Sequence, residues 1–406
     1  MSEPVVLGLL GLGTIGGGVW QALAGQSDLL AERVGRAVVV GKALVRDLAK
    51  PHPGVPPDLL TTDPREVVGD PRIGIVVEVL GGEHPAYELV KQALLSGQHV
   101  VTANKELLAK HGAELFALAR ERGLELACEA SVGGGIPIIA AIRKSLVANR
   151  VSRVRGIVNG TTNYILTEMV EKGRDFAAVL AEAQALGYAE PDPTNDVEGF
   201  DARYKLCVLS GLAFAAWPQP EDVPCQGITR LTAADLRFAG QFGYAVKLLA
   251  TVRPLAGAVE AGVEPTLVPL TSPLAVVNGV FNAVQVQGDL VGDTLFYGRG
   301  AGPAPTTSAI LGDVVAVARG ERSPLPLAGT VVRAVPATAT HYYLRLAPAE
   351  DARGLLHDAG LEILGHRAAG GAEAFLVRAA EPTAWPATQR RLSATGRLAA
   401  TLPVAP

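Results

Sequence analysis

Five carboxylates and one lysine lie close together in the segment LGYAEPDPTNDVEGFDARYKL, residues 186–206. They are Glu190, Asp192, Asp196, Glu198, Asp201 and Lys205. Such a group could be a metal cage, a solvated acidic loop or a polar pocket around one ammonium group. A calcium loop of the EF-hand type that starts at Asp192 needs glycine at its sixth position, where this chain has Val197. The pattern therefore argues against calcium and leaves the other two possibilities.

Asp201 and Lys205 are four residues apart, so a helix that begins near Val197 places them on one face. If both were exposed, the pair would contribute only a few tenths of a kcal/mol. However, the helix continues as LCVLSGLAFAA, which is nearly all apolar and predicts burial. We therefore expect Lys205 at the mouth of a pocket, where it could donate a proton. Asp192 and Glu198 are interpreted as loop and helix-cap charges.

A glycine-rich turn, residues 11–16, follows the apolar run VVLGLL and precedes a helical pattern. Its residues are Gly11, Leu12, Gly13, Thr14, Ile15 and Gly16. In a strand–turn–helix unit, such glycines permit a tight turn, close approach to a pyrophosphate and close helix–strand packing. The phosphates then lie at the positive end of the helix. Glycine-rich turns also arise from packing alone, but this context favours a bound dinucleotide.

The second expected strand ends in ALVRD, with Arg46 where an NAD-specific fold would place an acid. A guanidinium there can pair with a 2′-phosphate, so NADP is favoured and NAD remains possible. The alternative is a surface pair between Arg46 and Asp47.

Further on, VTANK ends another expected strand, which predicts Lys105 at the carboxyl edge of the sheet, beside the nicotinamide. A solvated lysine at a helix start is the alternative.

Strands and helices alternate in the first third of the chain, which predicts a parallel sheet covered on both faces. The strand candidates are residues 5–10, 37–45, 73–80, 99–103 and 124–130. Beyond residue 131, helical segments are followed by an extended sheet over about 244–297 and a helix over 306–319. Residues 322–338 have the composition of a linker. We expect an α/β chain with a smaller α+β unit at its end.

Composition limits the possible functions. The 406 residues suggest two or three domains, and a formal net charge of −4 gives no electrostatic case for nucleic acid or an anionic membrane surface. Three separated cysteines indicate a reduced, cytoplasmic compartment without disulfides or structural zinc. The charge-free run from Pro4 to Ser27 lacks a positive leader and contains seven glycines, so it predicts neither a signal peptide nor a membrane span.

Six motifs, in order over roughly residues 5–318, resemble the homoserine dehydrogenase family. They are GLGTIGGG, VVTANK, EASVGGGIPII, GIVNGTTNYILT, LGYAEPDPTNDVEGFDARYKL and GDLVGDTLFYGRGAGPAPTTSAI. The resemblance implies reversible hydride transfer between NAD(P)H and L-aspartate 4-semialdehyde, which yields L-homoserine for threonine, methionine and isoleucine biosynthesis. Because no kinase region precedes Met1, the chain is expected to be of the monofunctional type.

The resemblance also implies roles for individual residues. Lys205 corresponds to the proton donor and Lys105 to a second active-site lysine. Glu190 would bind the substrate's amino group, Asp201 would orient the substrate, and Asp196 would belong to the same pocket. Substrate would also lie near Asn159 and Thr162 of GIVNGTTNYI. The cofactor would contact two further glycines, Gly187 and Gly302.

The motif EASVGGGIPI resembles the family's loop for a monovalent cation, in which backbone carbonyls bind sodium. The corresponding residues are Glu129, Val132, Gly134 and Ile136. Glycines free carbonyl groups from regular hydrogen bonding, so binding of a hard cation is consistent with the composition. The residues are equally consistent with a strand-to-helix turn that has Pro137 in its first turn.

We expect a Rossmann-type NAD(P)-binding domain over residues 1–131 and 300–321, and an α+β catalytic and dimerisation domain with an extended sheet over 132–299. A linker at 322–338 would lead to a reduced ACT-like domain at 339–406, with a shortened first helix that puts threonine feedback in doubt. A homodimer or homotetramer is implied.

Two alternative functions remain. An aspartate dehydrogenase-like enzyme would not explain the block from Glu190 to Lys205, and a non-catalytic sensor would not need lysine at positions 105 and 205.

Overall fold

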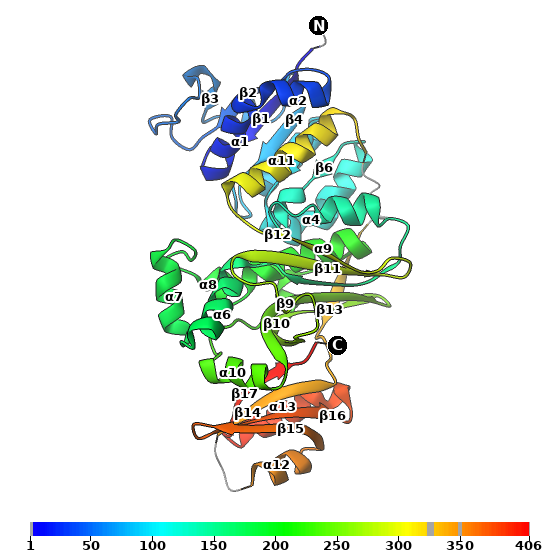
Figure 1. The fold of residues 1–406 in the computed structure, drawn as a ribbon. Coiled ribbons are helices and arrows are strands. Elements are labelled where there is room, and N and C mark those ends of the chain that lie inside the picture. Colours follow the sequence, from blue (N-terminus) through cyan, green and yellow to red (C-terminus); the bar gives the residue numbers. More distant parts are fainter. Residues whose placement is uncertain (1–2, 323–328, 348–350, 406) are drawn as a thin grey trace.

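The computed structural model describes residues 3–322, 329–347 and 351–405. Within these residues the chain forms three sheets of six, seven and four strands, which follow one another along the molecule (Figure 1). No helix in these ranges is both long and apolar enough to cross a membrane.

The first sheet is parallel and has the strand order β3-β2-β1-β4-β5-β6. Its strands are β1 (Val5–Leu10), β2 (Val38–Leu44), β3 (Leu60–Thr61), β4 (Ile75–Glu78), β5 (His99–Thr102) and β6 (Leu126–Ala127). The connecting helices are α1 (Thr14–Gly25), α2 (Ser27–Val34), α3 (Ala86–Leu95) and α4 (Lys105–Glu121). This is the Rossmann order, and the predicted fold class is confirmed. The order reverses between β1 and β4, and folds of this kind bind their ligands at the carboxyl ends of the strands beside such a point.

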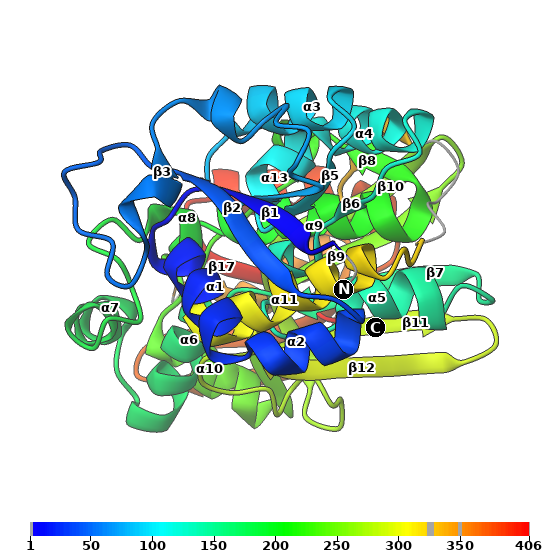
Figure 2. The same ribbon diagram turned by 90° about the horizontal axis from the view of Figure 1, so that it is seen from above.

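A helix from much later in the chain, α11 (Pro303–Ala318), completes this first layer. Its buried residues Ile310, Leu311 and Val314 share a core with Leu7 and Leu9 of β1. Figure 2 shows α11 beside α1, and a Cβ atom added to Gly18 of α1 would lie 2.7 Å from Thr307 Oγ1. The chain therefore leaves the layer of the parallel sheet, builds the second domain and returns.

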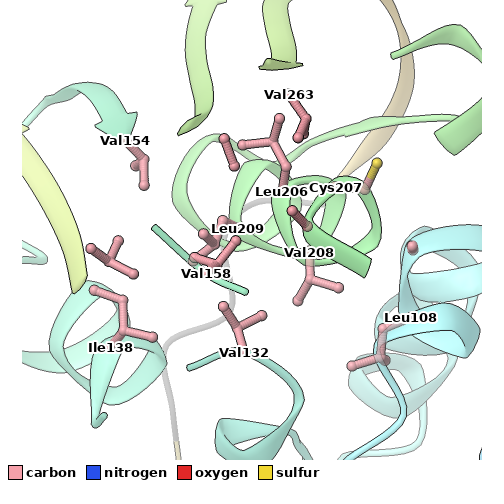
Figure 3. Packing of buried hydrophobic residues seen from close by; sticks show 14 of the residues in the cluster. Leu108, Val132, Ile138, Val154, Val158, Leu206, Cys207, Val208, Leu209 and Val263 are labelled. Atoms are coloured by element: carbon pink, nitrogen blue, oxygen red, sulfur yellow. The ribbon is translucent and has the colours of Figure 1, made fainter. Parts of the chain in front are cut away.

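The second sheet is mixed, with the order β12-β11-β7-β9-β10-β13-β8. Its strands are β7 (Val151–Ile157), β8 (Ala216–Pro218), β9 (Tyr244–Leu255), β10 (Ala258–Pro269), β11 (Phe281–Gly288), β12 (Gly292–Arg299) and β13 (Thr330–Val335). The helices of this domain are α5 (Ile138–Ala140), α6 (Gly160–Lys172), α7 (Phe176–Ala185), α8 (Thr194–Val197), α9 (Phe200–Phe214) and α10 (Ala233–Gln241). Leu206 and Leu209 of α9 belong to one cluster of buried residues with Val154 and Val158 (Figure 3), so the apolar run after Lys205 is buried as predicted.

The prediction of a linker over 322–338 was wrong for its second half. Residues 323–328 lie outside the described part of the chain, but Thr330–Val335 form β13. This strand pairs in parallel with β10 on one side and β8 on the other. The sequence TVVRAV is rich in β-branched residues, which suit a strand, and the flanking prolines and glycine had suggested a linker.

The C-terminal unit has a βαββαβ topology and the antiparallel strand order β15-β16-β14-β17. Its elements are β14 (His341–Leu346), α12 (Ala352–Asp358), β15 (Leu361–Ala369), β16 (Ala372–Ala379), α13 (Trp385–Ala394) and β17 (Leu398–Pro403). Residues 348–350 and 406 of the predicted ACT-like domain lie outside the described residues. The first helix of the unit is short, as expected, and the ACT-like assignment stays a prediction. Tyr343 and Arg345 of β14 bind the buried Asp235 of α10, which ties this unit to the second domain.

Candidate active site

Two lysines from different domains bind the same carboxylate. Lys205 Nζ lies 2.6 Å from Asp201 Oδ2 within α9. Lys105 Nζ, from the first residue of α4, lies 2.9 Å from Asp201 Oδ1. The two amines that the sequence placed in separate motifs therefore converge at the boundary between the Rossmann layer and the second domain.

These three side chains differ in their exposure to solvent. Asp201 and Lys205 are 7% and 8% exposed, whereas the side chain of Lys105 is 42% exposed. Lys205 also donates to the backbone oxygen of Val158, at 2.7 Å. A lysine ammonium group has three N–H donors, so one donor of Lys205 remains for a ligand after these two bonds. Lys105 is the more accessible amine.

The electrostatics of the site favour the charged forms of Asp201 and Lys105. Burial alone would raise the pKa of Asp201, but Lys205 and Lys105 together hold that pKa well below its ordinary value. Conversely, the charge of Asp201 raises the pKa of Lys105, although burial opposes the shift. One carboxylate thus holds two cationic groups that would otherwise repel each other.

Asn159 connects this triplet to a second acid. Its amide nitrogen donates to Asp201 Oδ2 at 2.9 Å and to Asp196 Oδ1 at 2.7 Å. Its amide oxygen accepts from the backbone N–H of Thr162, which makes Asn159 the N-cap of α6. Burial and the charge of Asp201 raise the pKa of Asp196.

Asn159 and Thr162 are buried and hydrogen-bonded to each other. All polar groups of the Asn159 side chain are engaged by Thr162, Asp196 and Asp201, and Thr162 is 1% exposed, with its hydroxyl bound to Asn159. Asn159 orients both acids, and Thr162 orients Asn159. The helix cap accounts for this arrangement, and a contact of either residue with substrate stays a prediction.

The remaining acids of the opening segment have separate environments. Glu190 is exposed in the loop between α7 and α8, and its carboxylate has no partner within the described residues. Asp192 accepts from the N–H and hydroxyl groups of Thr194 at the start of α8, as expected for a loop charge. Glu198 is the C-cap of α8, and its carboxylate accepts from the hydroxyl of Thr229, whereas Gly199 is the N-cap of α9. Glu190 is therefore the acid of this loop that is free to meet a cationic ligand.

The glycine turn has the geometry that a dinucleotide requires. Gly11 has a φ angle of +103°, and a Cβ atom added to Gly16 would lie 2.2 Å from the backbone oxygen of Gly11. Gly13, the N-cap of α1, and Thr14 are exposed, and Ile15 is half-buried, so the N-terminus of α1 is accessible. The other two predicted cofactor glycines lie at ends of other helices: Gly187 follows α7, and Gly302 is the N-cap of α11.

Arg46 lies in solvent just beyond β2. The carboxylate of the neighbouring Asp47 accepts from the backbone N–H of Ala49 at 2.9 Å, and no ion pair joins it to Arg46. Across the described ranges, the Arg46 guanidinium is not bound by another residue. The surface pair considered as an alternative is absent, and the guanidinium is available to an anionic ligand.

The loop at residues 129–136 combines a helix cap with free carbonyl groups. The carboxylate of Glu129 accepts from the backbone N–H groups of Ile139 and Ala140 at the start of α5. The carbonyl of Ile136 accepts from Ile138 N, whereas those of Val132 and Gly134 have no donor among the residues described. Among these residues, no cluster of three or more His, Cys, Asp or Glu side chains could hold a metal ion. A cation in this loop would therefore depend on backbone oxygens.

Comparison with known proteins shows the same family over most of the chain. Residues 11–129 match the family model for the homoserine dehydrogenase NAD-binding domain, and residues 137–315 match the model for homoserine dehydrogenase. The chain is 46% identical to a Pseudomonas aeruginosa homoserine dehydrogenase over 370 residues, which cover 87% of this chain and 84% of that protein. A Bacillus subtilis homoserine dehydrogenase is 44% identical, over a match that covers 79% of this chain and 74% of that protein.

Solved structures give the same result. A homoserine dehydrogenase from Thiobacillus denitrificans superimposes with a TM-score of 0.91 at 42% identity, over 99% of this chain and 98% of that one. A hyperthermophilic archaeal homoserine dehydrogenase in complex with NADPH has a TM-score of 0.68 at 26% identity, over 79% of this chain and 99% of that one.

Proposed function

The chain belongs to the homoserine dehydrogenase family of NAD(P)-dependent oxidoreductases, and on that premise we propose which of its residues carry the reaction between L-aspartate 4-semialdehyde and L-homoserine. The observation that carries the proposal is the pair of ion contacts that Asp201 makes with Lys105 and Lys205. It places two ammonium groups at the carboxyl edge of the Rossmann sheet, where such sheets bind their ligands.

Lys205 is the proton donor in this proposal. A bound nicotinamide supplies or accepts the hydride. Negative charge develops on the aldehyde oxygen during reduction, and a positioned ammonium group stabilises that charge and then protonates the oxygen. Lys205 has one N–H donor left for this oxygen, because Asp201 and Val158 occupy the other two. In the reverse direction, the same amine would take the proton from the hydroxyl group.

Lys105 and the acids divide the remaining tasks. Lys105 is half exposed and adds a second positive charge beside the reacting oxygen. Asp201 positions both lysines, and Asn159 holds Asp201 next to Asp196. The unpartnered carboxylate of Glu190 would bind the substrate's ammonium group, for which it has the required charge and exposure.

For the cofactor we propose NADP(H), with NAD(H) as a weaker alternative. The exposed and unpaired guanidinium of Arg46 at the end of β2 suits a 2′-phosphate. A family member from a hyperthermophilic archaeon was solved with NADPH, which supports this choice. Gly11, Gly13, Thr14, Ile15 and Gly16 would receive the pyrophosphate at the start of α1, and the ends of α7 and α11, at Gly187 and Gly302, would complete the site.

We further propose a sodium ion bound by the backbone oxygens of Glu129, Val132, Gly134 and Ile136. The unpartnered carbonyls of Val132 and Gly134 support it, since a hard cation prefers oxygen ligands. A cation there would stiffen the loop that leads from β6 to α5.

We also propose a homodimer through the sheet region 244–297, where Leu270, Val276 and Leu290 are exposed.

Substitution of Lys205 tests the proton-donor assignment. Lys205→Ala is expected to lower kcat by a factor of about 10²–10⁴, the usual contribution of a general acid. NADPH absorbance with aspartate semialdehyde measures the rate, and NADPH fluorescence measures cofactor binding, which should persist. Lys172→Ala is the matched control, since Lys172 lies in the same domain and pairs only with surface carboxylates.

The control variant should keep the rate of the wild type. Retention of more than half of the wild-type kcat in Lys205→Ala would show that another group donates the proton. Loss of cofactor binding together with activity would show that Lys205 supports the fold and not the chemical step.

A further inference from the structure

One fully buried carboxylate lies between the glycine turn and Lys105. Glu78, the last residue of β4, is 0% exposed, so it can touch neither substrate nor cofactor. Its Oε1 atom accepts from the backbone N–H of Leu80 at 2.8 Å, and its Oε2 atom accepts from Thr102 Oγ1 at 2.5 Å. Glu78 thus joins the turn after β4 to the end of β5. Sequence analysis missed it, although it is the one charged residue in the apolar segment IGIVVEVL.

From Thr102 the hydrogen bonds continue to the residue that precedes Lys105. Thr102 Oγ1 accepts from the backbone N–H of Asn104 at 3.0 Å. The amide nitrogen of Asn104 lies 3.5 Å from Glu78 Oε1 and donates to the backbone oxygen of Gly82 at 2.7 Å. The amide oxygen of Asn104 accepts from Leu107 N and so caps α4. Lys105 is the next residue, so this network determines where its side chain leaves the backbone.

On its other side, Glu78 borders the glycine turn. Val79 N donates to the backbone oxygen of Leu10 at 3.0 Å. A Cβ atom added to Gly11 would lie only 3.0 Å from the backbone oxygen of Val79. The residue just after Glu78 therefore packs directly against the glycine turn, at the point between β1 and β4 where the strand order reverses.

A buried carboxylate is costly unless hydrogen bonds compensate its desolvation. Burial raises the pKa of Glu78, and the bonds from Thr102, Leu80 and Asn104 oppose that shift. Thr102 is the last residue of β5, and Leu80 and Asn104 lie just beyond the ends of β4 and β5. The carboxylate thus links the residues after β4 to the end of β5, in addition to the backbone bond from Ala103 N to the oxygen of Glu78.

We propose that Glu78 is a positioning residue for the dehydrogenase reaction: through Thr102 and Asn104 it aligns Lys105 with the glycine turn and with Asp201. This inference rests on the proposed role of Lys105. It makes a specific claim, which is that replacement of Glu78 affects kcat through Lys105 and not through the general stability of the domain.

A double-mutant cycle in the full-length enzyme tests the claim. Glu78→Gln, Lys105→Ala and the double variant are compared with wild type by kcat, by KM for both substrates and by thermal midpoint. Glu78→Gln is expected to lower kcat about 10-fold in the wild-type background and less than about 2-fold when residue 105 is already alanine, because groups that act together are not additive. Glu66→Gln is the matched control: its carboxylate also accepts from a threonine, Thr61, in the same domain but in the edge strand β3.

Three results would overturn the inference. In the first, the same fold-loss of kcat occurs in both backgrounds. In the second, the thermal midpoint of Glu78→Gln falls while kcat per folded enzyme stays at the wild-type value. In the third, Lys105→Ala itself leaves kcat unchanged. That result would also refute the proposed role of Lys105, whereas the first two would refute only the role of Glu78. If Glu78→Gln does not fold, Thr102→Val, which removes the hydroxyl between Glu78 and Asn104, replaces it in the same cycle with the same expected non-additivity.

Discussion

Lys105 Nζ lies 2.9 Å from Asp201 Oδ1, and this ion pair crosses the boundary between two domains. Lys105 begins α4 of the Rossmann layer, whereas Asp201 belongs to α9, which packs against the second sheet on the side of α4 (Figure 1). The contact forms only when both domains are folded and correctly docked. The site is therefore assembled by the interface, and Asp201, which also holds Lys205, is its central group.

Replacement of Asp201 should affect stability as well as activity. Asp201→Asn leaves Lys205 buried without its counter-charge, so the free energy of unfolding at pH 7 should fall by about 3–5 kcal/mol. Because the folded pKa of Asp201 lies below its ordinary value, its stabilisation is complete above about pH 4 and is lost as the pH falls through the folded pKa. Urea unfolding of both proteins across pH 3–8 measures this. A wild-type advantage that stays constant down to pH 3 would contradict the role of the ion pairs.

Two adjacent glycines of α1 should respond oppositely to alanine. A Cβ atom at position 16 would lie 2.2 Å from the backbone oxygen of Gly11, so Gly16→Ala should cost about 1–3 kcal/mol and weaken NADPH binding. At position 17 no atom lies within 4 Å of the added Cβ, so Gly17→Ala should keep binding and gain about 0.5–1 kcal/mol from helix propensity. Thermal unfolding and NADPH titration test both variants. Equal cofactor affinity in the two would refute the expected close packing of the turn.

Arg46 should determine the preference between the two cofactors. Arg46→Ala removes a charged hydrogen bond to the 2′-phosphate, worth about 1.5–3 kcal/mol, so KM for NADPH should rise by a factor of about 10–150. KM for NADH, which lacks that phosphate, should change by less than about 2-fold. Steady-state kinetics with both cofactors provide the comparison, and Asp47→Asn is the neighbouring control. A parallel rise in both KM values would show that Arg46 does not contact the phosphate.

Asp313 of α11 should make folding stability depend on pH. Burial raises its pKa to about 7, and its carboxylate accepts from the backbone N–H of Glu129. An acid with a raised folded pKa contributes stability at low pH, which is lost as the pH rises from about 4 to 7, with a slope of at most about 1.4 kcal/mol per pH unit.

Asp313→Asn tests this slope, because asparagine keeps an acceptor oxygen for Glu129 N but does not titrate. Urea unfolding between pH 4.5 and 7.5 should give a shallower decline for the variant than for the wild type. Glu321→Gln, at an exposed carboxylate near the end of α11, should leave the wild-type slope nearly unchanged. Identical slopes for all three proteins would show that Asp313 does not titrate in this range.

Local patterns alone determined much of this protein. The strand at residues 5–10, the glycine turn and the helix after it follow from hydrophobic period and turn chemistry within a few residues. The placement of Asp201 and Lys205 on one helical face is equally local, because helical geometry sets the spacing of residues i and i+4. For the same reason five of the six strands of the parallel sheet were predictable. The two-residue strand β3 and the Thr330–Val335 strand were missed, the latter because the prolines and glycine that flank TVVRAV indicated a linker.

Only the tertiary structure decided which groups meet. Lys105 and Asp201 are far apart in sequence, and no pattern specifies that one carboxylate holds both lysines. The amide of Asn159 between two acids, and the buried Glu78 between two turns, likewise depend on the packing of separate elements. The physical reason is that a side chain's direction and burial are set by the elements that cover it, and those elements come from distant parts of the chain.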